Sequence, residues 1–149
     1  MKPITIIGGG LAGLTLGLAL RQRGVPVTLI EAGHYPRHRV CGEFISGRGQ
    51  RVLTELGLLD QLREIGAWTA ERAAFFPAGS REAMFTLPQS ALCVSRYTLD
   101  AFLAQRFVIL GGELRGDTRW AESCAVAGLV RATGRRARPS GDGWRWFGL

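Results

Sequence analysis

ITIIGGGLAGLTLGLALRQRGVPVTLIE, residues 4–31, reads as an apolar strand, a glycine-rich turn, a helical stretch, a second apolar strand and an acid, in that order. Gly8, Gly10 and Gly13 have the G-x-G-x-x-G spacing. That spacing alone is a weak signal. Between a strand and a helix, with an acid after the next strand, it is typical of a dinucleotide-binding βαβ unit. Residues 4–31 therefore predict an α/β, Rossmann-like fold with a parallel sheet.

Each element of this motif has a physical role in binding a nucleotide. The first glycine allows a sharp turn off the strand, the second allows backbone to approach a pyrophosphate, and the third allows the helix to pack closely on the strand. The helix start offers unpaired N–H groups and a partial positive charge to the phosphates. Glu31 is placed to accept hydrogen bonds from a ribose diol. The predicted pyrophosphate contacts are Gly8, Gly10, Leu11, Ala12 and Gly13.

The apolar run at residues 4–20 has a second interpretation, as an export signal or a short membrane span. A membrane span needs about 20 apolar residues, whereas this run is shorter and has four glycines in its first ten positions. Neither alternative explains the strand and acid that follow at the correct distance. Nucleotide binding is the better explanation.

Composition excludes several other classes of protein. The length of 149 residues suits one domain. Three widely spaced cysteines and two histidines predict neither a metal site nor a disulfide framework. The net charge of +7 raises the question of nucleic acid, but the arginines are spread along the chain and Lys2 is the only lysine. We therefore expect a small-molecule ligand, no nucleic-acid partner, no transmembrane segment and a cytoplasmic location.

The remaining sequence predicts a mixed pattern of short elements. Helical spacing of apolar residues and glycine stops indicate the helices, and apolar runs beside turn residues indicate the strands. Residues Trp144–Leu149 look like the opening of a strand, which suggests an interrupted chain. The predicted strands are Lys2–Gly8, Val25–Ile30, Arg72–Phe76, Ala83–Leu87, Leu92–Val94, one near Leu114 and Gly128–Ala132; the predicted helices are Leu11–Gly24, Arg48–Leu56, Leu59–Ile65 and Arg96–Ile109; residues 32–44 form a loop.

Taken together, four stretches resemble the FAD-dependent oxidoreductases of the p-hydroxybenzoate-hydroxylase fold, nearest to the branch with geranylgeranyl reductases and related monooxygenases. The first is the glycine motif with Glu31. The second, RHRVCGE at residues 37–43, is similar to the R-x-K-x-C-G-E motif of that branch, and it is the discriminating one. The third is VSR at residues 94–96, and the fourth is ATG at residues 132–134.

The resemblance implies FAD as cofactor, with its pyrophosphate at the glycine turn and its adenosine ribose at Glu31. In such proteins the loop after the second strand lies beside the flavin, so the RHRVCGE segment would line the cofactor. NAD(P)H is a possible electron donor to the intact enzyme. No catalytic residue and no metal ligand is predicted. The further residues that the resemblance implies as cofactor contacts are Ala32, Arg37, Arg39, Cys41, Gly42, Arg96 and Gly134.

Members of this family are more than twice as long and carry a later G-D motif that this sequence lacks. We therefore expect residues 1–149 to be an incomplete FAD-binding domain from the N-terminal part of a flavin-dependent reductase or monooxygenase. Residues 70–94 would be a β-rich segment on the substrate side, and their aromatic residues hint at an apolar substrate. Two alternatives stay open: an NAD(P)-binding Rossmann domain, and a non-catalytic remnant of a flavoenzyme.

Overall fold

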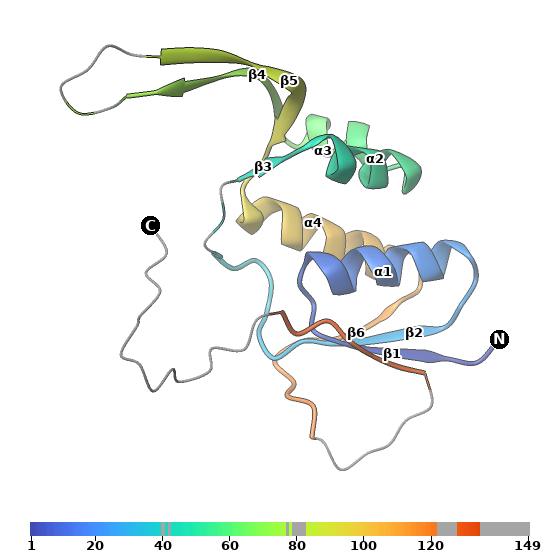
Figure 1. The fold of residues 1–149 in the computed structure, drawn as a ribbon. Helices are drawn as coiled ribbons and strands as arrows, with labels where there is room; N and C mark the ends of the chain where they lie inside the picture. Colours follow the sequence, from blue (N-terminus) through green and yellow to red (C-terminus); the bar gives the residue numbers. More distant parts are fainter. Residues whose placement is uncertain (40, 42, 77, 79–82, 122–127, 135–149) are drawn as a thin grey trace. The chain divides into compact units, whose positions relative to one another are not determined.

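The computed structural model describes residues 1–149 apart from 40, 42, 77, 79–82, 122–127 and 135–149 (Figure 1). The chain divides into two compact units. The first contains residues 1–40 and 100–149, and the second contains residues 41–99, so the second unit is inserted into the first.

The first unit is built on a four-stranded parallel sheet. Its strands are β1 (Ile4–Ile7), β2 (Val27–Ile30), β6 (Glu113–Arg115) and β7 (Leu129–Arg131), in the order β6-β2-β1-β7. From β1, the sheet continues through β2 to β6 on one side and to β7 on the other side. In an open α/β sheet such a reversal point is where ligands bind, beyond the carboxyl ends of the strands.

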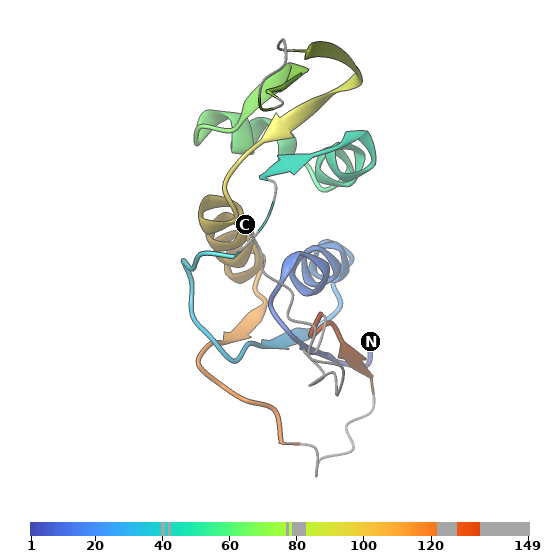
Figure 2. The ribbon, with the colours of Figure 1, turned by 60° about the vertical axis from the view of Figure 1, so that its left-hand side comes forward.

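Two helices lie on the same face of this sheet, as both ribbon views show (Figures 1 and 2). They are α1 (Leu11–Gln22) and α4 (Arg96–Ile109). Gly17 of α1 allows their close contact, because a β-carbon there would lie 2.9 Å from the ring of Phe107. The fully buried side chains around this contact form the core of the unit: Ile6, Leu14, Leu18, Leu29, Leu103 and Phe107.

The second unit combines two short helices with a three-stranded antiparallel sheet. The helices are α2 (Gly47–Glu55) and α3 (Leu59–Glu64), and the sheet has the order β3-β5-β4. Its strands are β3 (Phe44–Ile45), β4 (Trp68–Phe75) and β5 (Ala83–Cys93). Leu53 of α2 and Leu62 of α3 are buried, and α2 contacts α3 and the strands β3 and β5.

The structure confirms the parallel sheet of the predicted α/β fold and corrects one detail of the β-rich segment. The strands predicted at Ala83–Leu87 and Leu92–Val94 are one continuous strand, β5, which pairs with β4 along most of its length. The pairing register shifts between Ala70 and Arg72, opposite the Pro88 that interrupts the ladder. Residues 88–91, which begin with a proline, had suggested a break between two strands. Pairing with β4 keeps the segment in one extended strand.

Two further points concern a membrane-spanning segment and the end of the sequence. No helix in the described part of the chain is long and apolar enough to cross a bilayer. The strand predicted at Trp144–Leu149 lies outside the described residues.

Candidate nucleotide-binding site

The glycine turn connects β1 to α1 at the point where the strand order reverses. Gly8 has φ +103°, a conformation that L side chains rarely adopt, and a β-carbon there would lie 2.5 Å from the carbonyl oxygen of Ala132. Its N–H donates to the carbonyl of Ile30 at 2.8 Å. The first predicted glycine therefore makes the turn as expected, and it also brings the ends of β1, β2 and β7 together.

The start of α1 is open and rich in free donors. Gly10 is its N-cap, no side chain caps the helix, and the carbonyl of Gly10 already accepts the N–H of Leu14. The N–H groups of Gly10, Leu11 and Ala12 have no acceptor among the described residues. Nothing lies within 4 Å of a β-carbon built at Gly10. An open, positively polarised helix end with free N–H groups suits a pyrophosphate.

Gly13 has the third predicted role. A β-carbon at this position would overlap the carbonyl oxygen of Gly8, so only glycine allows α1 to approach the turn this closely.

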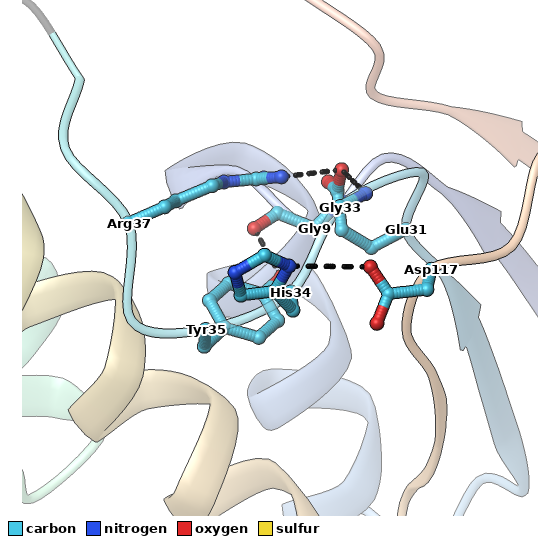
Figure 3. Close-up of polar contacts among 7 residues, drawn as sticks. All are labelled: Gly9, Glu31, Gly33, His34, Tyr35, Arg37 and Asp117. Carbon is cyan, nitrogen blue, oxygen red and sulfur yellow. Dashed lines mark hydrogen bonds and ion pairs between the residues drawn. The ribbon is translucent and has the colours of Figure 1, made fainter.

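Glu31, at the carboxyl end of β2, is the buried charge of the site, with a relative exposure of 5%. Its Oε2 accepts the N–H of Gly9 at 2.7 Å, and its Oε1 accepts the N–H of Gly33 at 2.9 Å (Figure 3). Arg37 Nη1 also donates to Oε1, at 2.7 Å. A carboxylate oxygen accepts two hydrogen bonds, so Oε1 is filled and Oε2 keeps one free position. The ribose diol expected from the sequence would find room for one direct hydrogen bond.

Glu31 is held in its ionised form. Burial alone would raise its pKa, but the hydrogen bonds from Arg37, Gly33 and Gly9, together with the charge of Arg37, lower the pKa to about 2. Hydrogen bonding to Glu31 raises the pKa of Arg37 in turn. The site therefore carries a fixed carboxylate throughout the physiological pH range.

Arg37 has two nitrogen atoms whose hydrogen-bonding capacity is unused. Its Nε and Nη2 are buried and have no hydrogen-bond partner among the described residues. Buried donors without acceptors are costly, so such groups are a sign of a ligand that is yet to bind. The oxygens of a phosphate or a ribose supply the kind of acceptor that would satisfy them.

The loop after β6 covers the outer side of Glu31. Thr118 donates its N–H to the carbonyl of Glu31 at 2.9 Å, and Asp117 donates its N–H to that of Gly33 at 3.0 Å. His34 and Asp117 also make an exposed contact of 3.3 Å, the type of surface pair that adds little stability. These backbone bonds fix the segment that carries the carboxylate.

The other predicted contacts are distributed over both units. Ala32 is exposed beside Glu31, and Gly134 follows β7 with φ +73°. Arg39 and Cys41 are exposed, and Gly42 lies outside the described residues. Glu43 has the rare φ of +56°, and its carbonyl accepts the N–H of Val94. Arg96 begins α4 in the second unit. Their roles at a cofactor remain predictions.

Sequence reasoning missed two residues that the structure brings to the turn. Tyr35 donates its hydroxyl to the carbonyl oxygen of Gly9 at 2.5 Å, and Gly9 occupies a position that the fingerprint leaves unspecified. The sequence offered one signal for Gly9, namely that a glycine also stands at this unspecified position between Gly8 and Gly10. A single tyrosine in a loop gave none.

Comparison with known proteins identifies the family. Residues 1–135 match the family described as FAD binding domain. The chain belongs to this family. FAD is therefore the cofactor of the domain, which confirms the resemblance drawn from the sequence and favours FAD over the NAD(P) alternative.

The relatives of this FAD-binding domain include a monooxygenase and an epoxidase. Kynurenine 3-monooxygenase of Dictyostelium discoideum is 43% identical over 68 residues, which are 43% of this chain and 15% of that protein. Squalene epoxidase 4 of Arabidopsis thaliana is 35% identical over 85 residues, 57% of this chain and 16% of that protein.

Solved structures agree on the fold. The FAD-binding domain matches 2-methyl-3-hydroxypyridine-5-carboxylic acid oxygenase with a TM-score of 0.70 and 28% identity, covering 78% of this chain and 32% of that one. A myxobacterial chondrochloren halogenase gives a TM-score of 0.73 at 23% identity, with 93% and 39% covered, and so shares the fold. The chain thus spans between 15% and 39% of the length of these proteins.

Proposed function

We propose that residues 1–149 supply the nucleotide-binding part of a flavin-dependent oxidoreductase of the monooxygenase type, and that FAD binds at the β1–α1 turn. One observation carries the proposal. The start of α1 has free N–H groups and open space, and it lies next to a buried, ionised Glu31. Anionic phosphates suit the helix end, and hydroxyl donors suit the carboxylate.

Each group of the site would contact a different part of FAD. The N–H groups at the start of α1 would bind the pyrophosphate, and the free position on Glu31 Oε2 would accept one ribose hydroxyl. The unpartnered Nε and Nη2 of Arg37 would donate to phosphate or ribose oxygens. Once bound, the flavin ring supplies the redox chemistry, and the protein supplies binding, orientation and charge.

Arg39, Cys41 and Gly42 would lie along the flavin, as the family resemblance implies, and Arg96 would also contact the cofactor. The positive φ of Glu43 supports a constrained conformation for this loop, since non-glycine residues in that region are strained and concentrate at functional sites. Ala32 and Gly134 would also contact the cofactor.

Titration of the full chain with FAD tests this function. We expect saturable, equimolar binding, detected by isothermal titration calorimetry and by quenching of flavin fluorescence. ADP should compete with FAD, because the proposed contacts involve the ADP half of the cofactor.

NADH in the same titration separates the alternatives. Binding of NADH with no binding of FAD would favour an NAD(P)-binding Rossmann domain. A folded chain that binds neither FAD nor ADP would contradict the proposal and favour a remnant without nucleotide binding.

We further propose that the second unit contacts an apolar substrate. In the intact enzyme, which we expect to be cytoplasmic, NAD(P)H would reduce the flavin. A cavity of about 530 Å³ supports this proposal. Its walls include the apolar side chains of Phe44, Leu87 and Pro88, and Arg72 adds one positive charge. A mostly apolar lining with a few polar groups is typical of small-molecule sites.

Filling this cavity tests the substrate side. Ala73→Trp should weaken the binding of 1-naphthol, a small apolar probe, because the indole occupies the cavity that Ala73 lines. Ala74→Trp is the matched control, since Ala74 neighbours Ala73 but is absent from the walls of this cavity. Fluorescence titration measures both variants. Equal naphthol affinity in the two variants would contradict an apolar site here.

A further inference from the structure

Two side chains that follow β2 bind the backbone of Gly9, one at its N–H group and one at its carbonyl group. Its N–H donates to Glu31 Oε2 at 2.7 Å, and its carbonyl accepts the Tyr35 hydroxyl at 2.5 Å (Figure 3). Glu31 is a predicted ribose contact, whereas Tyr35 has no role in the function proposed above. The phenol therefore needs its own explanation.

The space around Gly9 shows how closely the tyrosine is fitted to the turn. A β-carbon built at Gly9 would overlap the hydroxyl oxygen of Tyr35. The fingerprint does not require glycine at this position. In this chain glycine is required at position 9, because the phenol oxygen occupies the place of a β-carbon and Leu29 and Glu31 crowd the same space.

The hydrogen bond to the Gly9 carbonyl fixes the peptide group that leads into α1. This peptide is trans, since among the described residues only the Tyr35–Pro36 bond is cis. In a trans peptide the N–H points opposite to the C=O. The N–H of Gly10 is therefore turned away from Tyr35, and it has no acceptor among the described residues.

We infer that Tyr35 is a positioning residue for phosphate binding: its hydroxyl holds the Gly9–Gly10 peptide in the orientation that presents the start of α1 to a diphosphate. This inference rests on the proposed nucleotide site. Tyr35 acts through the backbone and has no direct contact with the reacting part of a cofactor. Holding the donors in place before binding removes the cost of ordering them when the ligand arrives.

The surroundings keep the phenol in its donating form. Burial and the negative charge of Glu31 both raise the pKa of Tyr35, so the hydroxyl stays protonated. The guanidinium of Arg37 lies 5.3 Å from the centre of the ring and holds it by a cation–π contact. Phenylalanine would keep the ring and this contact while losing only the hydrogen bond.

Tyr35→Phe therefore isolates the inferred role, and the test compares ADP with adenosine. We expect the Kd for ADP to rise about three- to tenfold, the range that one lost hydrogen bond produces. The Kd for adenosine, which has no phosphate, should stay unchanged. Tyr97→Phe, at the exposed tyrosine of α4, is the matched control and should bind both ligands normally.

Amide hydrogen exchange without ligand gives a second readout. Loss of the hydroxyl should speed exchange at the Gly9 N–H, which Glu31 otherwise protects. Where the unmodified chain binds ADP, an unchanged ADP affinity in Tyr35→Phe, or equal weakening of ADP and adenosine, overturns the inference. If the unmodified chain fails to bind ADP, the proposed function fails, and unchanged exchange at Gly9 in Tyr35→Phe then overturns the inference on its own.

Discussion

Gly10→Val is expected to abolish FAD binding while the protein without ligand stays folded. Nothing lies within 4 Å of a β-carbon at Gly10, so the free protein has room for the valine side chain. The backbone there is extended, with φ −80° and ψ −174°, a conformation that valine adopts readily. The same open space is the one that a pyrophosphate would fill. Valine would therefore block the ligand without disturbing the fold.

The expected loss of FAD affinity is large because the phosphates could no longer reach the N–H groups at the start of α1. We expect the Kd for FAD to rise at least about 100-fold, roughly 3 kcal/mol of binding free energy. Calorimetric titration measures the affinity, and thermal denaturation followed by circular dichroism measures the fold. Leu16→Val, at the half-exposed Leu16 of the same helix, is the matched control for a valine in α1. Full FAD affinity in Gly10→Val would place the phosphates elsewhere.

Glu31→Ala is expected to lower both the stability of the fold and its affinity for FAD. The change leaves the N–H groups of Gly9 and Gly33 without their acceptor and leaves Arg37 without its ion-pair partner. The free energy of unfolding should fall by about 2–4 kcal/mol, since breaking one side of a buried pair leaves the other charge uncompensated. Affinity for FAD should fall by about 1–3 kcal/mol through the loss of the ribose acceptor and the loosened turn.

The pH dependence of stability isolates the charge of Glu31. A carboxyl whose folded pKa is lowered from 4.5 to about 2 stabilises the fold above pH 4.5, and this contribution is lost as the pH falls toward 2. The shift corresponds to about 3 kcal/mol of stability, with little solvent screening because the side chain is buried. Glu31→Gln should lose this part of the acid dependence. Urea unfolding at a series of pH values measures it.

Glu113→Gln is the matched control for this measurement. The pKa of Glu113 is also lowered, by hydrogen bonds from Thr28 and Arg115, but its side chain is half exposed on β6. Its removal should change the acid dependence little. If Glu31→Gln and Glu113→Gln behaved alike, the buried ion pair with Arg37 would not be the source of the acid sensitivity.

The sequence predicted the parts of the fold in which local pattern and tertiary structure agree. Residues 4–31 carry a strand, turn, helix and strand whose periodicity and glycines all favour the same βαβ unit, and β1, α1 and β2 follow it. The long helix α4 was equally clear, because its apolar residues keep helical spacing over fourteen residues. Glu31 was found from its place directly after the second predicted strand of the glycine motif.

Other features depend on partners that are distant in sequence, and local pattern did not show them. Pairing with β4 joins the two strands predicted within β5 into one. The contact of Tyr35 with Gly9 spans 26 residues. Arg37 was predicted to line the cofactor, but nothing in the sequence indicated that it would bind Glu31 and fill one oxygen of the carboxylate. These contacts are set by how the loop after β2 folds back on the turn.

The insertion of residues 41–99 between β2 and α4 has a consequence for how the protein folds as it is synthesised. β1 and β2 emerge early and can pair at once, but β6 leaves the ribosome more than eighty residues later and β7 later still. Such non-local pairing is slow, because long loops must close before the contacts form. The paired strands β1 and β7 are the first and last of the described strands to be made. A nascent chain therefore lacks the β7 neighbour of β1 until residue 131 has emerged, and until then it exposes the edge of β1 to other strands.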